Sequence, residues 1–158
     1  MTQATVTITS VDRVYLPKLA YQIAMPQPQT HLFEVTLTVS NWHGDVLDVK
    51  MPVWTPGSYL VREYARQLQN FVAVNSQGGK LTASKISKHQ WQIQTDNSSK
   101  ILISYRMFAN ELTVRTNHLN ATHGYFNPAA LCFYVPGYEQ CPIEINIIPP
   151  HPDWQITT

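Results

Sequence analysis

Residues 33–40 have the sequence FEVTLTVS, in which apolar and polar side chains alternate strictly. Because successive side chains of a β-strand point to opposite faces, this pattern predicts a strand with one buried and one solvent-facing side. The side chains on its buried side would be Phe33, Val35, Leu37 and Val39. Such a strand is typical of an antiparallel sheet that covers a hydrophobic core.

Similar short apolar segments lie on both sides of this strand, separated by turn-forming residues. They are residues 5–16, 19–25, 46–53, 71–74, 81–86, 89–95, 100–108, 112–115, 131–135 and 143–148. About ten short strands with turns every eight to twelve residues predict an all-β fold, an antiparallel β-sandwich with one short helix. A turn at residues 41–45 predicts that residues 46–53 return as the partner strand of residues 33–40.

The segment 52–67, PVWTPGSYLVREYARQ, interrupts the strand pattern. Pro56 and Gly57 predict a turn, because proline lacks an N–H group and glycine readily adopts a positive φ. The apolar residues that follow at four-residue intervals, on one face of a predicted short helix, are Leu60, Tyr64 and Leu68. The residues alone favour a helix that closes one end of the sandwich, with Trp54 and Tyr59 as its apolar cap.

Five segments of the sequence resemble those of a known protein family. In chain order they are HLFEVTLTV (31–39), MPVWTPGSYLVREYARQLQNF (51–71), KHQWQI (88–93), ISYRMFANELTVRTNHLN (103–120) and THGYFNPAALCFYVPGYE (122–139). Together they resemble the N-terminal domain of the glycyl aminopeptidase family, whose members are zinc metallopeptidases that bear a PDZ domain. The matching segments occur in the same order as in the family, over roughly residues 21–158, and the hexapeptide WTPGSY is the most specific match.

The resemblance implies that residues 1–150 form a non-catalytic β-sandwich domain and that residues 151–158 begin the connection to a missing catalytic domain. In the parent protein, a zinc-activated water would remove N-terminal glycine or alanine residues. The zinc ligands, the general base and the PDZ domain would lie after Thr158. Residues 154–158 alternate as a strand that stops without a turn. We therefore expect the catalytic domain of the same parent chain as the main partner, and peptide substrate as a second.

The composition agrees with a domain that is partly covered by another surface. Of the 158 residues, 44% are hydrophobic and only 13% are charged, about half of the usual charged fraction near 25%. A net charge of +1 without a basic run argues against a nucleic-acid partner. The chain contains no apolar run long enough to cross a membrane, and residues 1–10 lack the features of a signal peptide. We expect a cytoplasmic protein without a membrane partner.

No sequence pattern predicts an active site in these residues. A zinc peptidase of this family needs HExxH, which places two imidazoles on one side of a helix, and none of the six histidines forms it. The apolar surroundings of Cys132 should raise the pKa of its thiol. We expect Cys132 and Cys141 to be two buried free thiols rather than a disulfide. The expectation is no catalytic residue, metal ligand or cofactor in this fragment, with zinc in the parent protein.

The long irregular segment 116–127 is the candidate functional region, because long loops in compact domains tend to carry function. Its side chains suit the wall of a groove, and the family resemblance implies that this domain can close one side of a substrate cleft. The predicted cleft or interdomain residues are Tyr59, Arg62, His118, His123, Tyr125 and Asn127. The alternative, that this loop packs only on its own sandwich, stays open.

Two other functions fit the composition. One is a stand-alone carbohydrate- or protein-binding sandwich that uses Trp42, Trp54, Trp91 and the many tyrosines as a stacking platform, although the alternation of Trp91 with Ile93 argues that Trp91 belongs to the core. The other is self-association of the isolated domain through its weakly charged face.

Overall fold

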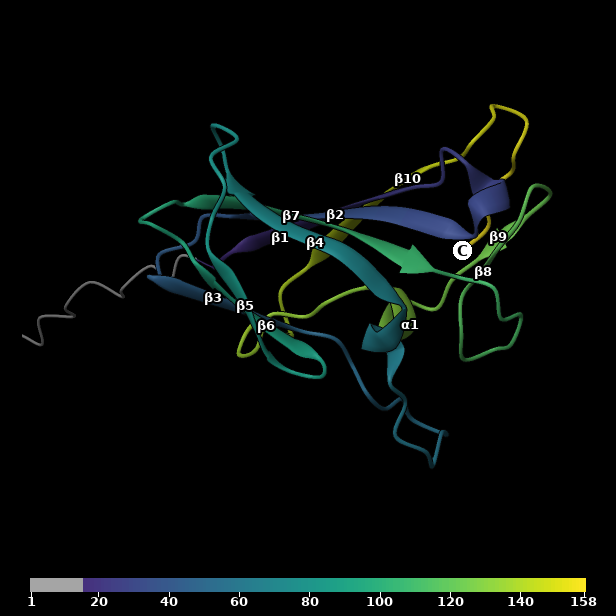
Figure 1. The fold of residues 1–158 in the computed structure, drawn as a ribbon, viewed down its shortest axis with the longest axis horizontal. Coiled ribbons are helices and arrows are strands. Elements are labelled where there is room, and N and C mark those ends of the chain that lie inside the picture. Colours follow the sequence, from purple (N-terminus) through teal and green to yellow (C-terminus); the bar gives the residue numbers. More distant parts are fainter. Residues whose placement is uncertain (1–15) are drawn as a thin grey trace, which may run out of the picture.

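The computed structural model describes residues 16–158, so the strand predicted over residues 5–16 lies outside the described residues except for Leu16. The described chain is mostly antiparallel β-structure with one short α-helix, as the sequence predicts (Figure 1). The elements are β1 (Lys18–Ala24), η1 (Pro28–Thr30), β2 (Leu32–Ser40), β3 (Val46–Lys50), η2 (Tyr64–Gln67), β4 (Leu68–Asn75), β5 (Ala83–Ser87), β6 (Gln90–Gln94), β7 (Lys100–Phe108), β8 (His118–Leu119), β9 (Gly124–Tyr125), α1 (Pro128–Leu131) and β10 (Ile143–Ile148). None of the described helices is long and apolar enough to cross a membrane.

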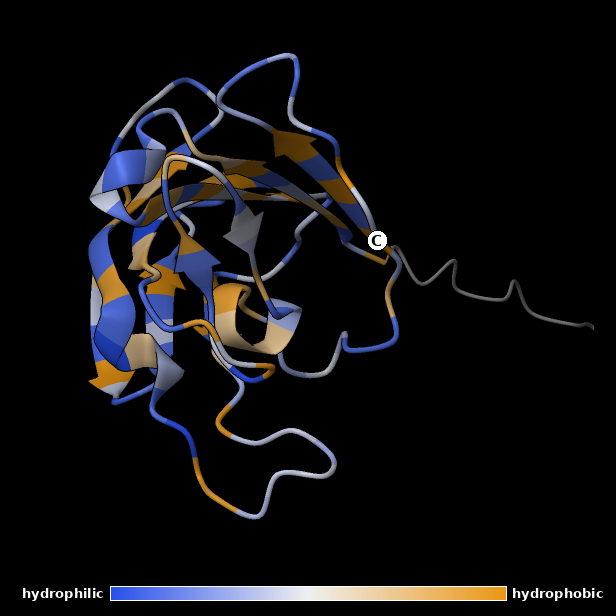
Figure 2. Cartoon of the chain, turned by 90° about the vertical axis from the view of Figure 1, so that its right-hand side faces the viewer, coloured by the Kyte–Doolittle hydropathy of each residue, from blue (hydrophilic) through white to orange (hydrophobic). Residues whose placement is uncertain are grey.

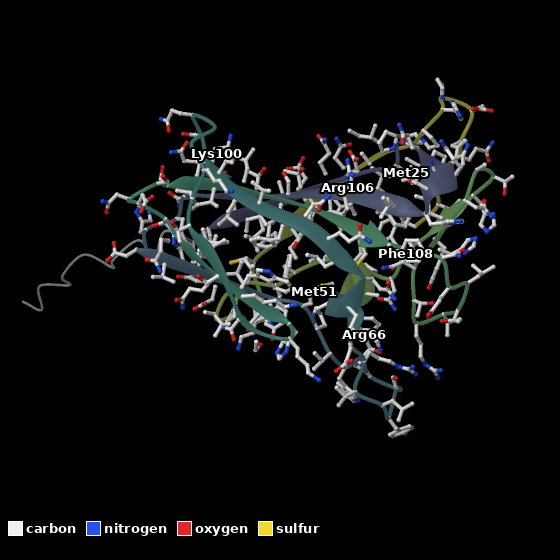
Figure 3. All side chains as sticks on the ribbon, viewed as in Figure 1. Met25, Met51, Arg66, Lys100, Arg106 and Phe108 are labelled. Atoms are coloured by element: carbon white, nitrogen blue, oxygen red, sulfur yellow. The ribbon has the colours of Figure 1, made fainter. Side chains whose placement is uncertain are left out.

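The strands form two layers and a small hairpin. A five-stranded sheet has the order β10-β1-β2-β7-β4, and a three-stranded sheet has the order β3-β6-β5. Figure 1 shows the three-stranded sheet below the five-stranded one, and Figure 3 shows that side chains fill the space between them. The hairpin β8-β9 lies beyond the end of β2 and β7.

The alternating strand predicted at residues 33–40 becomes β2, at the centre of the larger sheet. Its predicted inward side chains are all buried, and the polar ones between them are partly exposed. The neighbouring strand β7 alternates in the same register, with Val35 opposite Tyr105 and Leu37 opposite Ile103. From the smaller sheet, Leu47 and Ile93 are fully buried against this face.

Strand β3 does not pair with β2, contrary to the sequence prediction. It pairs with β6 instead, with Val49 opposite Trp91. After β2 the chain crosses to the second layer through Asn41, whose φ is 61°. The alternation of apolar residues specifies which side of a strand is buried, but it does not determine which strand pairs with it.

The helix predicted from Leu60, Tyr64 and Leu68 is also wrong. Only the 3₁₀ turn η2 forms, Leu60 is exposed, and Leu68 is the first residue of β4. The one α-helix within residues 16–158 is α1, whose last residue, Leu131, is the first residue of the strand predicted at 131–135. Asn127 caps it by accepting a hydrogen bond from Ala129 N at 3.0 Å, and proline at the first helical position fits the cap.

Three terminal or loop predictions need correction. Residues 112–115 and 154–158 contain no strand. Strand β10 forms as predicted, but it pairs in parallel with β1 at the edge of the sheet, with Tyr21 opposite Ile145. The outer position explains why Ile143 and Ile145 remain partly exposed despite their alternation.

The end of α1 and the segment after it are held under the large sheet by two buried tyrosines. Tyr21 Oη donates to the carbonyl of Phe133 at 2.7 Å, and Tyr105 Oη donates to the carbonyl of Leu131 at 2.7 Å. Burial raises the pKa of both phenols well above the ordinary value, so both remain protonated donors. Cys132, between the two acceptors, and Cys141 are unpaired and buried, as predicted. Burial raises the pKa of the Cys132 thiol to about 12.

Replacing the buried phenol of Tyr105 should weaken the fold. Tyr105→Phe leaves the carbonyl of Leu131 buried without its donor, which should lower the free energy of unfolding by about 1–2 kcal/mol. Urea denaturation monitored by tryptophan fluorescence measures the loss. Tyr134→Phe is the control, because the phenol of Tyr134 bonds no other residue within 16–158, and its effect should stay within about 0.5 kcal/mol. Equal losses in both variants would contradict the assignment.

Candidate functional site

The loop of residues 52–63 projects away from the sandwich, at the bottom of Figures 1 and 2. Its turn at Pro56-Gly57 forms as predicted, with Gly57 at φ 82° and Ser58 N bonded to the carbonyl of Thr55 at 3.0 Å. Arg62 N bonds the carbonyl of Val53 at 2.7 Å and closes the base of the loop. The loop therefore has a defined shape although most of it leaves the body of the domain.

The tip of this loop is apolar and faces solvent. The exposed fractions are 96% for Tyr59, 62% for Leu60, 74% for Val61 and 53% for Trp54. The interpretation of Trp54 and Tyr59 as an apolar cap on the sandwich is therefore wrong. A cap needs the chain to fold back over the core, whereas the Arg62–Val53 bond holds the loop outward.

A second loop, residues 110–117, lies beside the first at the same end of the molecule (Figure 1). The hydroxyl of Thr116 donates to the carbonyl of Glu111 at 2.6 Å and lies 2.8 Å from that of Thr113, which makes a compact turn. Leu112 and Val114 at the tip of this turn are 64% and 75% exposed. Both loops thus present apolar side chains to solvent.

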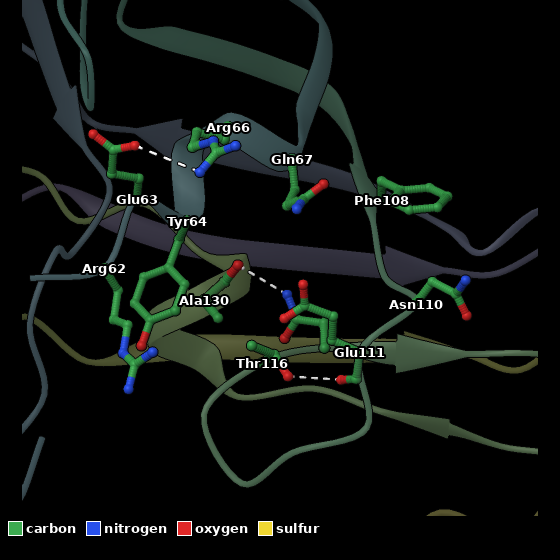
Figure 4. Close-up of a pocket in the computed structure, with 11 residues that line it drawn as sticks. Arg62, Glu63, Tyr64, Arg66, Gln67, Phe108, Asn110, Glu111, Thr116 and Ala130 are labelled. Atoms are coloured by element: carbon green, nitrogen blue, oxygen red, sulfur yellow. Dashed lines mark hydrogen bonds and ion pairs between the residues drawn. The ribbon is translucent and has the colours of Figure 1, made fainter. Parts of the chain in front are cut away.

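A pocket of about 490 Å³ lies between the bases of the two loops (Figure 4). Its floor is made by η2 and α1, and its rim is made by both loops. The lining residues that the following argument uses are Arg62, Glu63, Tyr64, Arg66, Glu111 and Ala130. Pockets of this size suit small molecules or one or two amino-acid side chains.

Two of the four charged side chains in this pocket already have partners. Glu63 lies 2.8 Å from Lys88 Nζ and 3.8 Å from Arg66. The hydrogen bond and the charge of Lys88 hold the pKa of the Glu63 carboxyl below its ordinary value. Arg62 and Glu111, in contrast, make no ion pair within residues 16–158.

Buried polar atoms beside Arg62 also lack partners. Arg62 Nε and Tyr64 Oη are both inaccessible to solvent and bond no other atom of the described residues. Tyr64 itself is only 7% exposed. Buried donors without acceptors cost free energy, so a group that accepts hydrogen bonds from them would stabilise this side of the pocket.

Of the six predicted site residues, Arg62 is the one that lines this pocket, and Tyr59 lies on the projecting loop. The other four belong to the β8-β9 hairpin or its flank. His118 pairs with Tyr125 across the hairpin, and the rings of His118 and His123 lie 4.9 Å apart. Asn127 is the cap of α1. The structure brings these four together with one another and not with Arg62.

Local hydrogen bonds explain the conformation of the hairpin loop. Asn120 Oδ1 accepts from Thr122 N at 2.8 Å and from His123 N at 3.0 Å.

Tyr125 lines a separate groove of about 550 Å³ with Phe126, Ile145 and Trp154. Its role at a substrate cleft, like that of the other predicted residues, stays a prediction.

The tryptophans do not form a stacking platform. Trp91 is buried, as its alternation with Ile93 predicts, and it stacks on Phe71 with ring centroids 5.4 Å apart. Trp42 packs edge-on against Tyr138. Of the three proposed tryptophans only Trp54 is exposed, and Tyr59 and Tyr125 are exposed among the tyrosines. A carbohydrate-binding surface would have to use these residues, and it stays a prediction.

Asn117 is an organising residue that the sequence alone did not single out. Its side chain is buried, donates from Nδ2 to the carbonyl of Ala130 at 2.9 Å, and accepts from Asn127 N at 3.0 Å. It therefore joins the second loop to α1, across the floor of the pocket. An asparagine inside a polar loop gives no sequence signal for this role, since burial is what distinguishes it.

Removing this side chain should loosen the pocket. Asn117→Ala leaves the Ala130 carbonyl and the Asn127 N–H without partners, which should cost about 2–4 kcal/mol in a urea unfolding experiment. The control is Asn146→Ala on the exposed strand β10, which should change stability by less than about 0.5 kcal/mol. A loss at Asn117 as small as that at Asn146 would refute the structural role.

Comparison with known proteins assigns the chain to a family. A family model described as the Peptidase M61 N-terminal domain matches residues 20–158. The chain belongs to this family. A crystal structure described as an aminopeptidase N family protein from Idiomarina loihiensis is similar, with a TM-score of 0.78 and 32% sequence identity. The similarity covers 84% of this chain and 22% of that one. A search of curated proteins gave no match.

This chain therefore spans about a fifth of the length of the solved protein that it resembles. Within residues 16–158 no group of three or more His, Cys, Asp or Glu side chains could hold a metal ion. The described residues do not fit a zinc site. The chain is the N-terminal domain of a peptidase-family protein.

Proposed function

We propose that this chain is the non-catalytic N-terminal domain of a zinc aminopeptidase, that it packs on the catalytic domain, and that it forms one wall of the substrate cleft. The observation that carries the proposal is the pair of apolar loops beside the pocket. Their exposed side chains come from two separate segments, residues 54–61 and 112–114. Large apolar groups that gather at one end of a domain are typical of a surface that a partner covers.

The mixture of apolar and polar groups at this end fits a contact between domains of one chain. Such interfaces bury roughly 600–1,500 Å² and are usually more polar than permanent interfaces between subunits. Here the bases of the two loops that carry the apolar tips line the polar pocket that holds Arg62 and Glu111. A partner that covers the tips would leave the pocket at the junction, where a substrate peptide could enter.

The chemistry of the parent protein rests on the family resemblance and not on the described residues. The resemblance supports a zinc-activated water, a preference for N-terminal glycine or alanine, and a PDZ domain, all supplied by the parent outside this domain. Two unpaired cysteines are consistent with a cytoplasmic location, since that compartment keeps thiols reduced. Self-association of the isolated domain would use the same apolar loops.

Hydrogen exchange tests the docking surface directly. In the full-length parent, backbone amides of residues 53–63 and 111–116 should exchange at least about tenfold more slowly than in the 158-residue chain, because a covering domain shields them. The control is the exposed turn at residues 76–79, which should exchange equally in both. Equal exchange of the two loops with and without the rest of the parent would refute docking at this face.

The cleft wall is tested by kinetics of the full-length parent. Tyr59→Ala should raise KM for an alanine anilide at least about threefold with a smaller change in kcat, because a wall residue contributes to binding rather than to the chemical step. Val72→Ala on the outer face of the large sheet is the control and should change neither constant. An unchanged KM for Tyr59→Ala would remove the cleft role and leave the docking role standing.

A further inference from the structure

We propose that the end of the domain that carries the two loops binds an acidic surface of the neighbouring domain in the parent protein, and that a carboxylate of this surface bonds Arg62. This inference rests on the docking role proposed above and adds the charge of the partner to it. The surface concerned, called the loop end below, consists of residues 52–67, 85–89 and 110–117. These three segments line two cavities that share Arg62 and Tyr64.

Basic side chains are concentrated at the loop end. It holds five of them and two acidic side chains, which gives a net charge of +3, whereas the other described residues hold five basic and seven acidic ones, a net charge of −2. The charged side chains of the loop end are Arg62, Arg66, Lys85, Lys88, Arg115, Glu63 and Glu111. The net charge of +1 for the whole chain hides this difference. Because complementary charges orient partners and disfavour wrong ones, an acidic surface fits this end.

Four of the basic side chains border a cavity with partly apolar walls. This cavity, of about 370 Å³, lies between the first loop, η2 and the turn that joins β5 to β6. Its apolar residues include Val53, Val61 and Ala65. Among its lining residues only Glu63 is acidic, and Lys88 already bonds that carboxylate at 2.8 Å. A partner that buries an apolar side chain in this cavity would bring its flanking residues close to the basic side chains.

Two buried groups beside this cavity lack hydrogen-bond partners. Arg62 Nε and Tyr64 Oη are inaccessible to solvent and bond no other atom of residues 16–158, and Figure 4 shows the two side chains next to each other. Arg62 as a whole is partly exposed, so a carboxylate can approach its guanidinium. An arginine N–H group only donates and an ionised carboxylate only accepts, which makes the carboxylate its matching partner. One acidic side chain of the neighbouring domain therefore bonds Arg62.

A lipid surface is the other partner that apolar tips and basic side chains could fit. Glu63 and Glu111 lie on the same surface, and anionic headgroups would repel their carboxylates. Sedimentation of the 158-residue chain with vesicles of equal parts phosphatidylserine and phosphatidylcholine distinguishes the two partners. The chain should stay in the supernatant, and co-sedimentation would overturn the proposal in favour of a membrane.

The salt dependence of docking in the full-length parent tests the charge of the partner. Backbone amides of residues 53–63 should exchange more slowly in the parent than in the 158-residue chain. This protection should fall at least about fivefold between about 50 mM and about 500 mM KCl, because salt screens exposed charges. Protection that is equal at both concentrations would overturn the acidic partner and leave the docking role standing. Absence of protection at both concentrations would overturn both.

Charge-altering variants of the full-length parent locate the contact. Arg62→Gln and Arg115→Glu should each lower the protection of residues 53–63 at least about threefold at low salt. Lys80→Gln and Lys100→Glu change the charge by the same amounts at exposed positions outside the loop end, and they should leave the protection unchanged. Equal losses in a control and its counterpart would reduce the effect to overall charge and overturn the proposal. Arg115 is exposed and makes no ion pair within residues 16–158, so its variant keeps the test decisive should Arg62→Gln fail to fold.

Discussion

The fold depends on two buried phenols that hold an irregular segment against the larger sheet. The second layer has only three strands and cannot cover the whole inner face of five. The rest is covered by residues 131–135, whose carbonyls at Leu131 and Phe133 accept from Tyr105 and Tyr21. Backbone bonds between Lys50 and Tyr134, at 2.9 and 2.8 Å, extend this cover from the edge of β3. A segment without regular structure thereby completes the sandwich.

The position of this segment also determines where the pocket lies. It continues directly from α1, whose Ala130 contributes to the floor of the pocket, and Asn117 ties that floor to the second loop. The first loop reaches the pocket through η2, which packs on α1. The groups that could bind a ligand therefore lie on short turns, and buried hydrogen bonds hold these turns in place. The core thus fixes the position of Arg62 relative to Glu111.

The sequence predicts which face of a strand is buried, but it does not predict which strands lie next to each other. Alternation identified the buried sides of β2 and β6, because period-2 burial is a local property of a strand. It could not reveal that β3 joins the opposite layer or that residues 128–135 turn into a helix and an irregular cover, since both depend on distant contacts. At the pocket, Arg62 was identified through the family resemblance of its segment. Tyr64 and Glu111 were missed, because their unbonded state is visible only when the surrounding atoms are in place.

The parallel pairing of β1 with β10 has a mechanical consequence. Because these first and last described strands run in the same direction, the chain enters the sheet at one end and leaves it at the other. A pull on the two flanking segments would act along the strands and load all six register pairs, from Leu19–Ile143 to Ala24–Ile148, in shear. Hydrogen bonds loaded in shear share the force and must break together, whereas antiparallel terminal strands would open one pair at a time. A pull along these two strands is therefore resisted by the whole set of register pairs at once.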